Sequence, residues 1–126
     1  AMMRDQKLWT WHLAAGAVIL ILLGLHMGIM HLNAVLGIFN APGTHPVDWA
    51  NVVARGRSAA FMVSYILLLG AALFHGLYGL RNILIELDPA RWLKRAIGVV
   101  LLVGGIGLFA LGTWAAIAGF SLAKAM

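Results

Sequence analysis

The stretch that decides the fold is residues 97–122, which read IGVVLLVGGIGLFALGTWAAIAGFSL. It contains no charged side chain, and about 20 consecutive apolar residues of helix are enough to cross the hydrocarbon core of a bilayer. Two further runs of the same character cover residues 13–32 and 59–80. The sequence therefore predicts an all-α membrane protein with three transmembrane helices.

The composition of the whole chain agrees with this prediction. Of its 126 residues, 63% are hydrophobic and 10% are charged. A soluble domain of this size cannot bury so much apolar surface, so lipid must cover most of it. The chain has no cysteine, which excludes a disulfide or an iron–sulfur cluster carried by this chain. We expect a single membrane domain over residues 1–126.

The two loops that connect the three predicted spans differ in length. Residues 86–96 form a short loop with Asp88-Pro89 as the helix breaker, whereas residues 33–58 form a longer loop. In the longer loop, Pro46 can open a short amphipathic helix over residues 47–54. The third run is rich in glycine, which offers a close-packing face either for a partner subunit or for another helix of this chain.

Basic side chains are unequally divided between the two ends of the predicted spans. Six lie at one end and three at the other: Arg4, Lys7, Arg81, Arg91, Lys94 and Arg95 against Arg55, Arg57 and Lys124. Cytoplasmic ends of membrane helices carry the excess of lysine and arginine. We therefore expect a cytoplasmic amino terminus, an inner loop at residues 86–96 and an outer loop at residues 33–58. The location expected is the inner (cytoplasmic) membrane of the cell, with lipid contacts and no nucleic-acid partner.

Two histidines lie inside apolar runs that contain no acid, lysine or arginine: His26 in the first run and His75 in the second. An ionisable side chain at membrane depth is costly and marks a functional site, and neutral imidazole is a common ligand of metals and haem iron. At 1.5 Å per residue, the two imidazoles differ in depth by roughly 14 Å, so they cannot ligate the same iron. A hydrogen bond to a carbonyl or a serine across the bundle is the alternative for each.

Two more histidines, one at each end of the first run, have candidate roles. His31 lies at the outer end of the span and is the rival of His26 for an outer haem. His12 shares a helix face with His26 and lies at the inner interface beside Trp9 and Trp11. There it could donate a hydrogen bond to a haem propionate or a quinone head group, or it could be a solvated interfacial histidine.

Residues 73–86, LFHGLYGLRNILIE, resemble the second-helix motif of the cytochrome b membrane subunits of succinate dehydrogenase and fumarate reductase. In that family the histidine is followed by glycine four residues on, then by arginine, a polar residue and an acid at the inner boundary. The matching positions are His75, Gly79, Arg81, Asn82 and Glu86. The resemblance implies that His75 is an axial ligand of the haem nearer the iron–sulfur subunit.

Residues 11–16, WHLAAG, look like a degraded form of the amino-terminal His-Arg-x-x-Gly signature of the same family, with Leu13 where the arginine is expected. An outer histidine on the first helix followed by an inner histidine on the second is similar to the two-haem branch. This implies that His26 ligates an outer haem. Three helices instead of five imply that a second membrane anchor subunit supplies the remaining axial histidines, so that the two subunits together form a haem-binding bundle.

The function implied by the resemblance is that of a haem b-carrying anchor subunit of succinate:quinone oxidoreductase. Such a subunit passes electrons between the iron–sulfur subunit and menaquinone or ubiquinone, alongside the flavoprotein subunit, and has no catalytic site for succinate itself. One or two haems would be shared with the partner subunit. Candidate contacts to a haem propionate or quinone are Trp11, His12, Tyr78, Arg81 and Asn82.

Other classes of protein remain open from the sequence. A cytochrome b subunit of a hydrogenase or formate dehydrogenase uses the same ligation, although such subunits usually carry more spans. A histidine beside glycines can also ligate the magnesium of chlorophyll, and a purely structural anchor has a similar composition. The absorption spectrum separates these classes.

Overall fold

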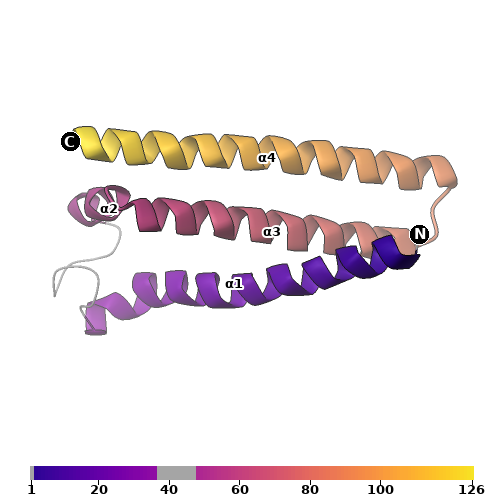
Figure 1. The fold of residues 1–126 in the computed structure, drawn as a ribbon, viewed down its shortest axis with the longest axis horizontal. Helices are drawn as coiled ribbons and strands as arrows, with labels where there is room; N and C mark the ends of the chain where they lie inside the picture. The colour runs from indigo at the N-terminus through magenta and orange to yellow at the C-terminus, as the bar shows by residue number, and fades with distance from the viewer. Residues whose placement is uncertain (1, 37–47) are drawn as a thin grey trace.

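The computed structural model describes residues 2–36 and 48–126 (Figure 1). Over these residues the chain is all-helical, with elements α1 (Met2–Leu36), α2 (Trp49–Gly56), α3 (Ala59–Glu86) and α4 (Arg91–Ala125). Helices α1, α3 and α4 are each long and apolar enough to cross a membrane. The predicted all-α membrane protein with three transmembrane helices is confirmed.

The predicted spans are the apolar middles of longer helices. Helix α1 begins at Met2 and α4 begins at Arg91, because the polar residues before each apolar run contain no helix breaker. The predicted inner loop at residues 86–96 is therefore reduced to residues 87–90. Asp88 adopts a left-handed backbone conformation there, with φ of 50°, and Pro89 prevents α3 from continuing. Lys94 donates a hydrogen bond of 2.9 Å to the Asp88 carboxylate across this turn.

The short helix predicted over residues 47–54 is observed as α2, Trp49–Gly56. Pro46, which was predicted to open it, lies outside the described residues, as do residues 37–47 of the outer loop as a whole. The Arg57 side chain, directly after α2, donates a hydrogen bond of 3.1 Å from Nε to the carbonyl of Ala123. Carbonyls in the last turn of a helix lack partners within the helix and carry partial negative charge. The bond therefore fastens α2 to the carboxyl-terminal end of α4.

Helix α3 is the middle of a flat layer, with α1 along one side and α4 along the other (Figure 1). It packs against both, whereas the described parts of α1 and α4 do not pack against each other. Consecutive long helices run in opposite directions, so the two termini lie at opposite ends of the layer. Of the described residues, only His12, Arg55 and Ala123 are buried. Both faces of the layer are open and apolar, so lipid or further helices must cover them.

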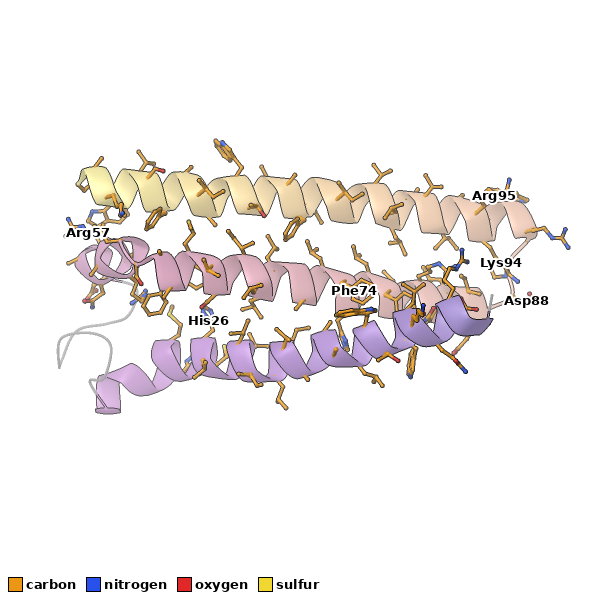
Figure 2. The ribbon with its side chains drawn as sticks, in the orientation of Figure 1. His26, Arg57, Phe74, Asp88, Lys94 and Arg95 are labelled. Carbon is orange, nitrogen blue, oxygen red and sulfur yellow. The ribbon has the colours of Figure 1, made fainter. Side chains whose placement is uncertain are left out.

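The two predicted groups of basic residues lie at opposite ends of the layer. Arg57 lies at the end where α4 finishes, and Lys94 and Arg95 lie at the end where α4 begins (Figure 2). This arrangement agrees with the division made from the sequence. It does not by itself orient the layer in a membrane.

The glycines of α4 divide into two sets. Gly105 and Gly112, seven residues apart, face leucines of α3, and a Cβ on Gly105 would lie 2.7 Å from Cδ1 of Leu77. By contrast, a Cβ on Gly104 or Gly107 would meet no atom within 4 Å. Part of the glycine-rich face therefore packs within the chain, because small residues allow α3 and α4 to approach closely.

Candidate functional site

The imidazole rings of His12 and His75 stack face to face at the crossing of α1 and α3. Their centroids lie 4.1 Å apart and their planes differ by 1°. Nδ1 of His75 also lies 3.0 Å from the backbone carbonyl oxygen of His12. A carbonyl only accepts hydrogen bonds, so Nδ1 of His75 carries the proton and donates it. The two helices are thus joined by one stack and one hydrogen bond at membrane depth.

Two glycines make room for the stacked rings. A Cβ on Gly16 would lie 3.0 Å from Cε1 and 3.2 Å from Nδ1 of His75, and a Cβ on Gly79 would lie 3.3 Å from Cε1 of His12. Each helix carries the same spacing, His12 with Gly16 and His75 with Gly79. Residues four apart share a helix face. Because the helices are antiparallel, each histidine ring lies over the glycine of the other helix.

Aromatic side chains of both helices, Trp9 of α1 and Tyr78 of α3, contact the His12 ring. The Trp9 ring stacks on His12 at 5.0 Å, and the Tyr78 ring lies 5.4 Å from His12 at a tilt of 53°. His12 is only 8% exposed, so it is not the solvated interfacial histidine that the sequence left open. Its Nδ1 is buried and has no hydrogen-bond partner among the described residues. A buried polar atom without a partner is costly, which makes this crossing the candidate functional site.

The environment of His75 fits a metal ligand. Histidines that ligate metals commonly donate the proton of one ring nitrogen to a carbonyl, which fixes the tautomer and leaves the other nitrogen free to ligate. The bond from Nδ1 of His75 to the His12 carbonyl has this form, and it leaves Nε2 without a hydrogen bond to the described residues. A hydrogen bond across the bundle was the alternative to iron ligation for His75. The observed bond uses Nδ1 only, so Nε2 still requires an explanation.

A haem at this position would need a second axial ligand from outside the described part of the chain. The described residues contain no cluster of three or more metal-ligating side chains. His12 cannot be the opposite ligand, because its ring touches the face of His75 and leaves no room for a macrocycle between them. Of the haem-ligand histidines predicted from the sequence, His75 is the one whose ring is oriented by a hydrogen bond within the described residues.

His26 and His31 lie away from the pair. His26 is half-buried and meets Tyr65 edge-on, with ring centroids 6.2 Å apart and an interplanar angle of 84°. Tyr65 and His75 are ten residues apart on α3, which places His26 and His75 about 15 Å apart along the layer. The structure therefore keeps the separate depths expected from the sequence. The His31 side chain is exposed.

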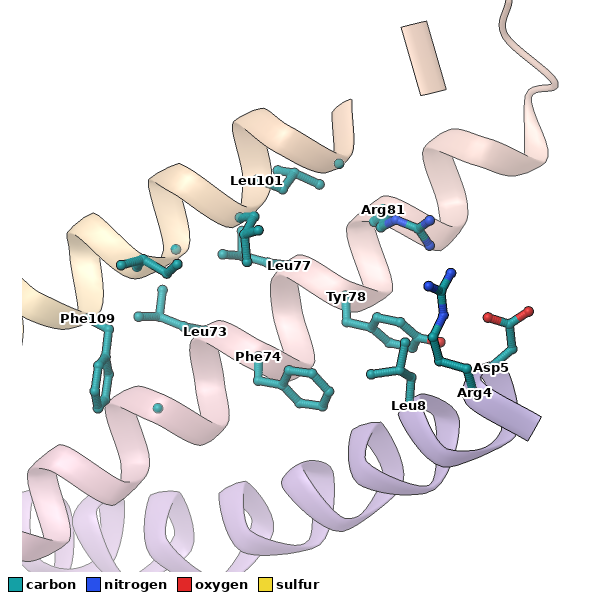
Figure 3. A pocket seen from close by; sticks show the side chains of 15 residues that line it. Arg4, Asp5, Leu8, Leu73, Phe74, Leu77, Tyr78, Arg81, Leu101 and Phe109 are labelled. Carbon is teal, nitrogen blue, oxygen red and sulfur yellow. The ribbon is translucent and has the colours of Figure 1, made fainter. Parts of the chain in front are cut away.

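A cavity of about 580 Å³ opens between the first turn of α1 and the facing sides of α3 and α4 (Figure 3). Two of the predicted contact residues, Tyr78 and Arg81, line it together with Arg4 and Asp5, and no histidine lines it. Sequence analysis missed Arg4 and Asp5 as site residues, because only the fold brings the start of α1 beside the end of α3.

The remaining predicted contacts do not meet in this cavity. His12 touches Tyr78 from the side of α1, whereas Trp11 is exposed and Asn82 is half-buried outside the cavity lining. The predicted contact set is therefore split between the histidine pair and the cavity.

The fold and the site define a class: a membrane protein of three spanning helices whose first two spans are joined by a stacked histidine pair. Comparison with protein-family models, curated proteins and solved structures finds no match for this chain. The function is therefore argued from the site.

Proposed function

We propose that this chain is a haem b-carrying membrane anchor subunit of succinate:quinone oxidoreductase, which passes electrons between an iron–sulfur subunit and membrane quinone. The observation that carries the proposal is the hydrogen bond from Nδ1 of His75 to the His12 carbonyl, 3.0 Å long, which leaves Nε2 free to ligate iron. The resemblance of residues 73–86 to the second-helix motif supports the same role.

The residues of this chain have distinct tasks in the proposal. His75 ligates the iron through Nε2, the His12 carbonyl fixes the orientation of the His75 ring, and Gly16 lets the ring approach α1. A haem b held there supplies reversible one-electron transfer. The low dielectric of the surrounding spans contributes to its potential. That Arg81 contacts a propionate or quinone remains a prediction.

The second axial ligand comes from a second membrane subunit in this proposal. His12 cannot serve, and His26 lies about 15 Å away along the layer. The flat layer supports the idea, because the faces of α3 between its two neighbours are free to receive helices of another subunit. His26 would ligate a second, outer haem in the same shared manner.

The proposed location is the cytoplasmic membrane, with the amino terminus in the cytoplasm. The end of the layer that carries the larger group of basic residues would then face inward. The iron–sulfur and flavoprotein subunits would dock at this end, nearer to His75 than to His26.

Replacement of His75 by alanine tests the proposal. The complex is purified through this chain from its native membrane, and haem is measured per protein from the reduced-minus-oxidised spectrum. The His75→Ala variant should lose one low-spin haem b while its spans remain inserted, and His31→Ala serves as the matched control on an exposed histidine. Equal haem content in the His75→Ala and wild-type complexes would overturn the proposal. Chlorin bands in the wild type would indicate a pigment-binding protein, and the absence of any bands a structural anchor.

A further inference from the structure

Two arginines converge at one end of the cavity between α1, α3 and α4. Arg4 comes from the first turn of α1 and Arg81 from the last turns of α3, and their guanidinium groups point toward each other (Figure 3). Neither arginine forms an ion pair with a carboxylate of the described residues. Asp5 lines the same end without pairing with either. Two like charges at the mouth of one cavity favour an anion between them.

The rest of the cavity is apolar and extends into the membrane. Leucines of α3 and α4 line its walls, and its lining on α4 extends from Gly98 to Phe109. Eleven residues of helix correspond to about 16 Å of depth, which is close to the thickness of one leaflet of the hydrocarbon core. The cavity therefore has a cationic mouth at the surface and an apolar channel one leaflet deep.

We propose that this cavity is a binding site for an anionic phospholipid of the leaflet on the amino-terminal side. The phosphodiester would lie between Arg4 and Arg81, because guanidinium groups bind phosphate oxygens in a fixed two-pronged geometry. One acyl chain would lie along the apolar walls toward Phe109. Basic pockets between membrane helices are typical sites for anionic lipid head groups, and a cavity of about 580 Å³ is within the usual range of ligand sites.

Two other occupants fit less well. No histidine lines the cavity, so a haem ligated by His75 does not occupy it. A quinone head group is neutral, so it would not compensate the positive charges of Arg4 and Arg81. The proposal goes beyond the electron-transfer function and does not depend on it, since it concerns residues outside the histidine pair. It assigns Arg81 to a lipid phosphate in place of the propionate or quinone contact predicted from the sequence.

The test uses the full-length chain in neutral detergent micelles and native mass spectrometry. Dioleoylphosphatidylglycerol and dioleoylphosphatidylcholine are offered together, and the anionic lipid should be retained at least tenfold more. The Arg4→Gln and Arg81→Gln variants should each reduce this preference about fivefold, which is the usual effect of one basic side chain on attraction to anionic lipid. The control is Arg95→Gln, which removes an exposed charge outside the cavity and should leave the preference within about twofold of wild type.

The apolar part of the site is tested by filling it. Leu102 lines the cavity and Val103 does not, and both are 64% exposed. Leu102→Trp should abolish retention of the anionic lipid, whereas Val103→Trp should not. The proposal is overturned if both lipids are retained equally or if the arginine variants match Arg95→Gln. The proposal is also overturned if glycerol 3-phosphate displaces the anionic lipid as effectively as more of that lipid does. Retention of decylubiquinone in place of the anionic lipid would overturn it as well. None of these results bears on haem content, so the two proposals fail independently.

Discussion

Replacing Gly16 by alanine adds one methyl group where α1 meets the His75 ring. The new Cβ would lie 3.0 Å from Cε1 and 3.2 Å from Nδ1 of that ring. Optimal contacts between such atoms are at about 3.5–4.0 Å, so the ring or the helix must move by a few tenths of an ångström. Overpacking of this kind costs about 1–3 kcal/mol. Alanine also favours the helix by about 1 kcal/mol relative to glycine, which offsets part of that cost.

Gly24→Ala is the matched control, because a Cβ at this position of α1 meets no atom within 4 Å. The Gly16→Ala variant should therefore be less stable than Gly24→Ala by about 1–3 kcal/mol, the cost of the contact alone. The assay is unfolding of the full chain in mixed micelles with increasing dodecyl sulfate, followed by near-ultraviolet circular dichroism. Gly79→Ala and Gly76→Ala form the corresponding pair on α3, with a smaller difference because the contact there is 3.3 Å. Equal stability of Gly16→Ala and Gly24→Ala would refute the packing of the His75 ring on α1.

The remaining predictions concern the outer histidines, the inner turn, the orientation and the second subunit. His26→Ala should remove only an outer haem and His31→Ala none; the reverse pattern in haem spectra would show that the ligand was chosen wrongly. A hydrogen bond from Lys94, together with its charge, lowers the pKa of the Asp88 carboxyl. Asp88→Asn should therefore destabilise the fold slightly at neutral pH, and the difference in unfolding should vanish as the pH falls through that lowered pKa. An amine-reactive probe outside intact cells should label Lys124 and not Lys94; the opposite result reverses the topology. The chain expressed alone should bind haem poorly or in a five-coordinate form, and two low-spin haems in a monomer would exclude shared ligation.

The main features of the fold were predictable because they depend on local composition. An uninterrupted apolar run such as residues 97–122 has only one low-energy state in a bilayer, a helix that satisfies its own backbone hydrogen bonds. The positions of the three spans, the breaker at Asp88-Pro89 and the two groups of basic residues follow from the same reasoning. The ends of the helices were less predictable, because the polar turns before Leu13 and Ile97 are compatible with either helix or loop.

The sequence singled out one member of the histidine pair, His75, but did not predict that His12 lies against it. The isolation of His75 in an apolar run singled it out, and the spacing of histidine and glycine in residues 12–16 and 75–79 was a signal for the crossing that sequence analysis did not connect. Helical periodicity assigns each histidine to a face of its own helix. It does not state which residue of an antiparallel neighbour lies opposite that face.

The sequence by itself determined that this chain spans a membrane three times and that His75 lies within a span. Only the tertiary structure decided that His12 stacks on His75, that Gly16 and Gly79 receive the rings, and that Arg4 and Arg81 line the same cavity. The physical reason is the difference in range of the two kinds of interaction. Transfer of an apolar helix into lipid is a sum over its own residues, whereas the register between two helices depends on contacts between residues about sixty positions apart, which no local pattern specifies.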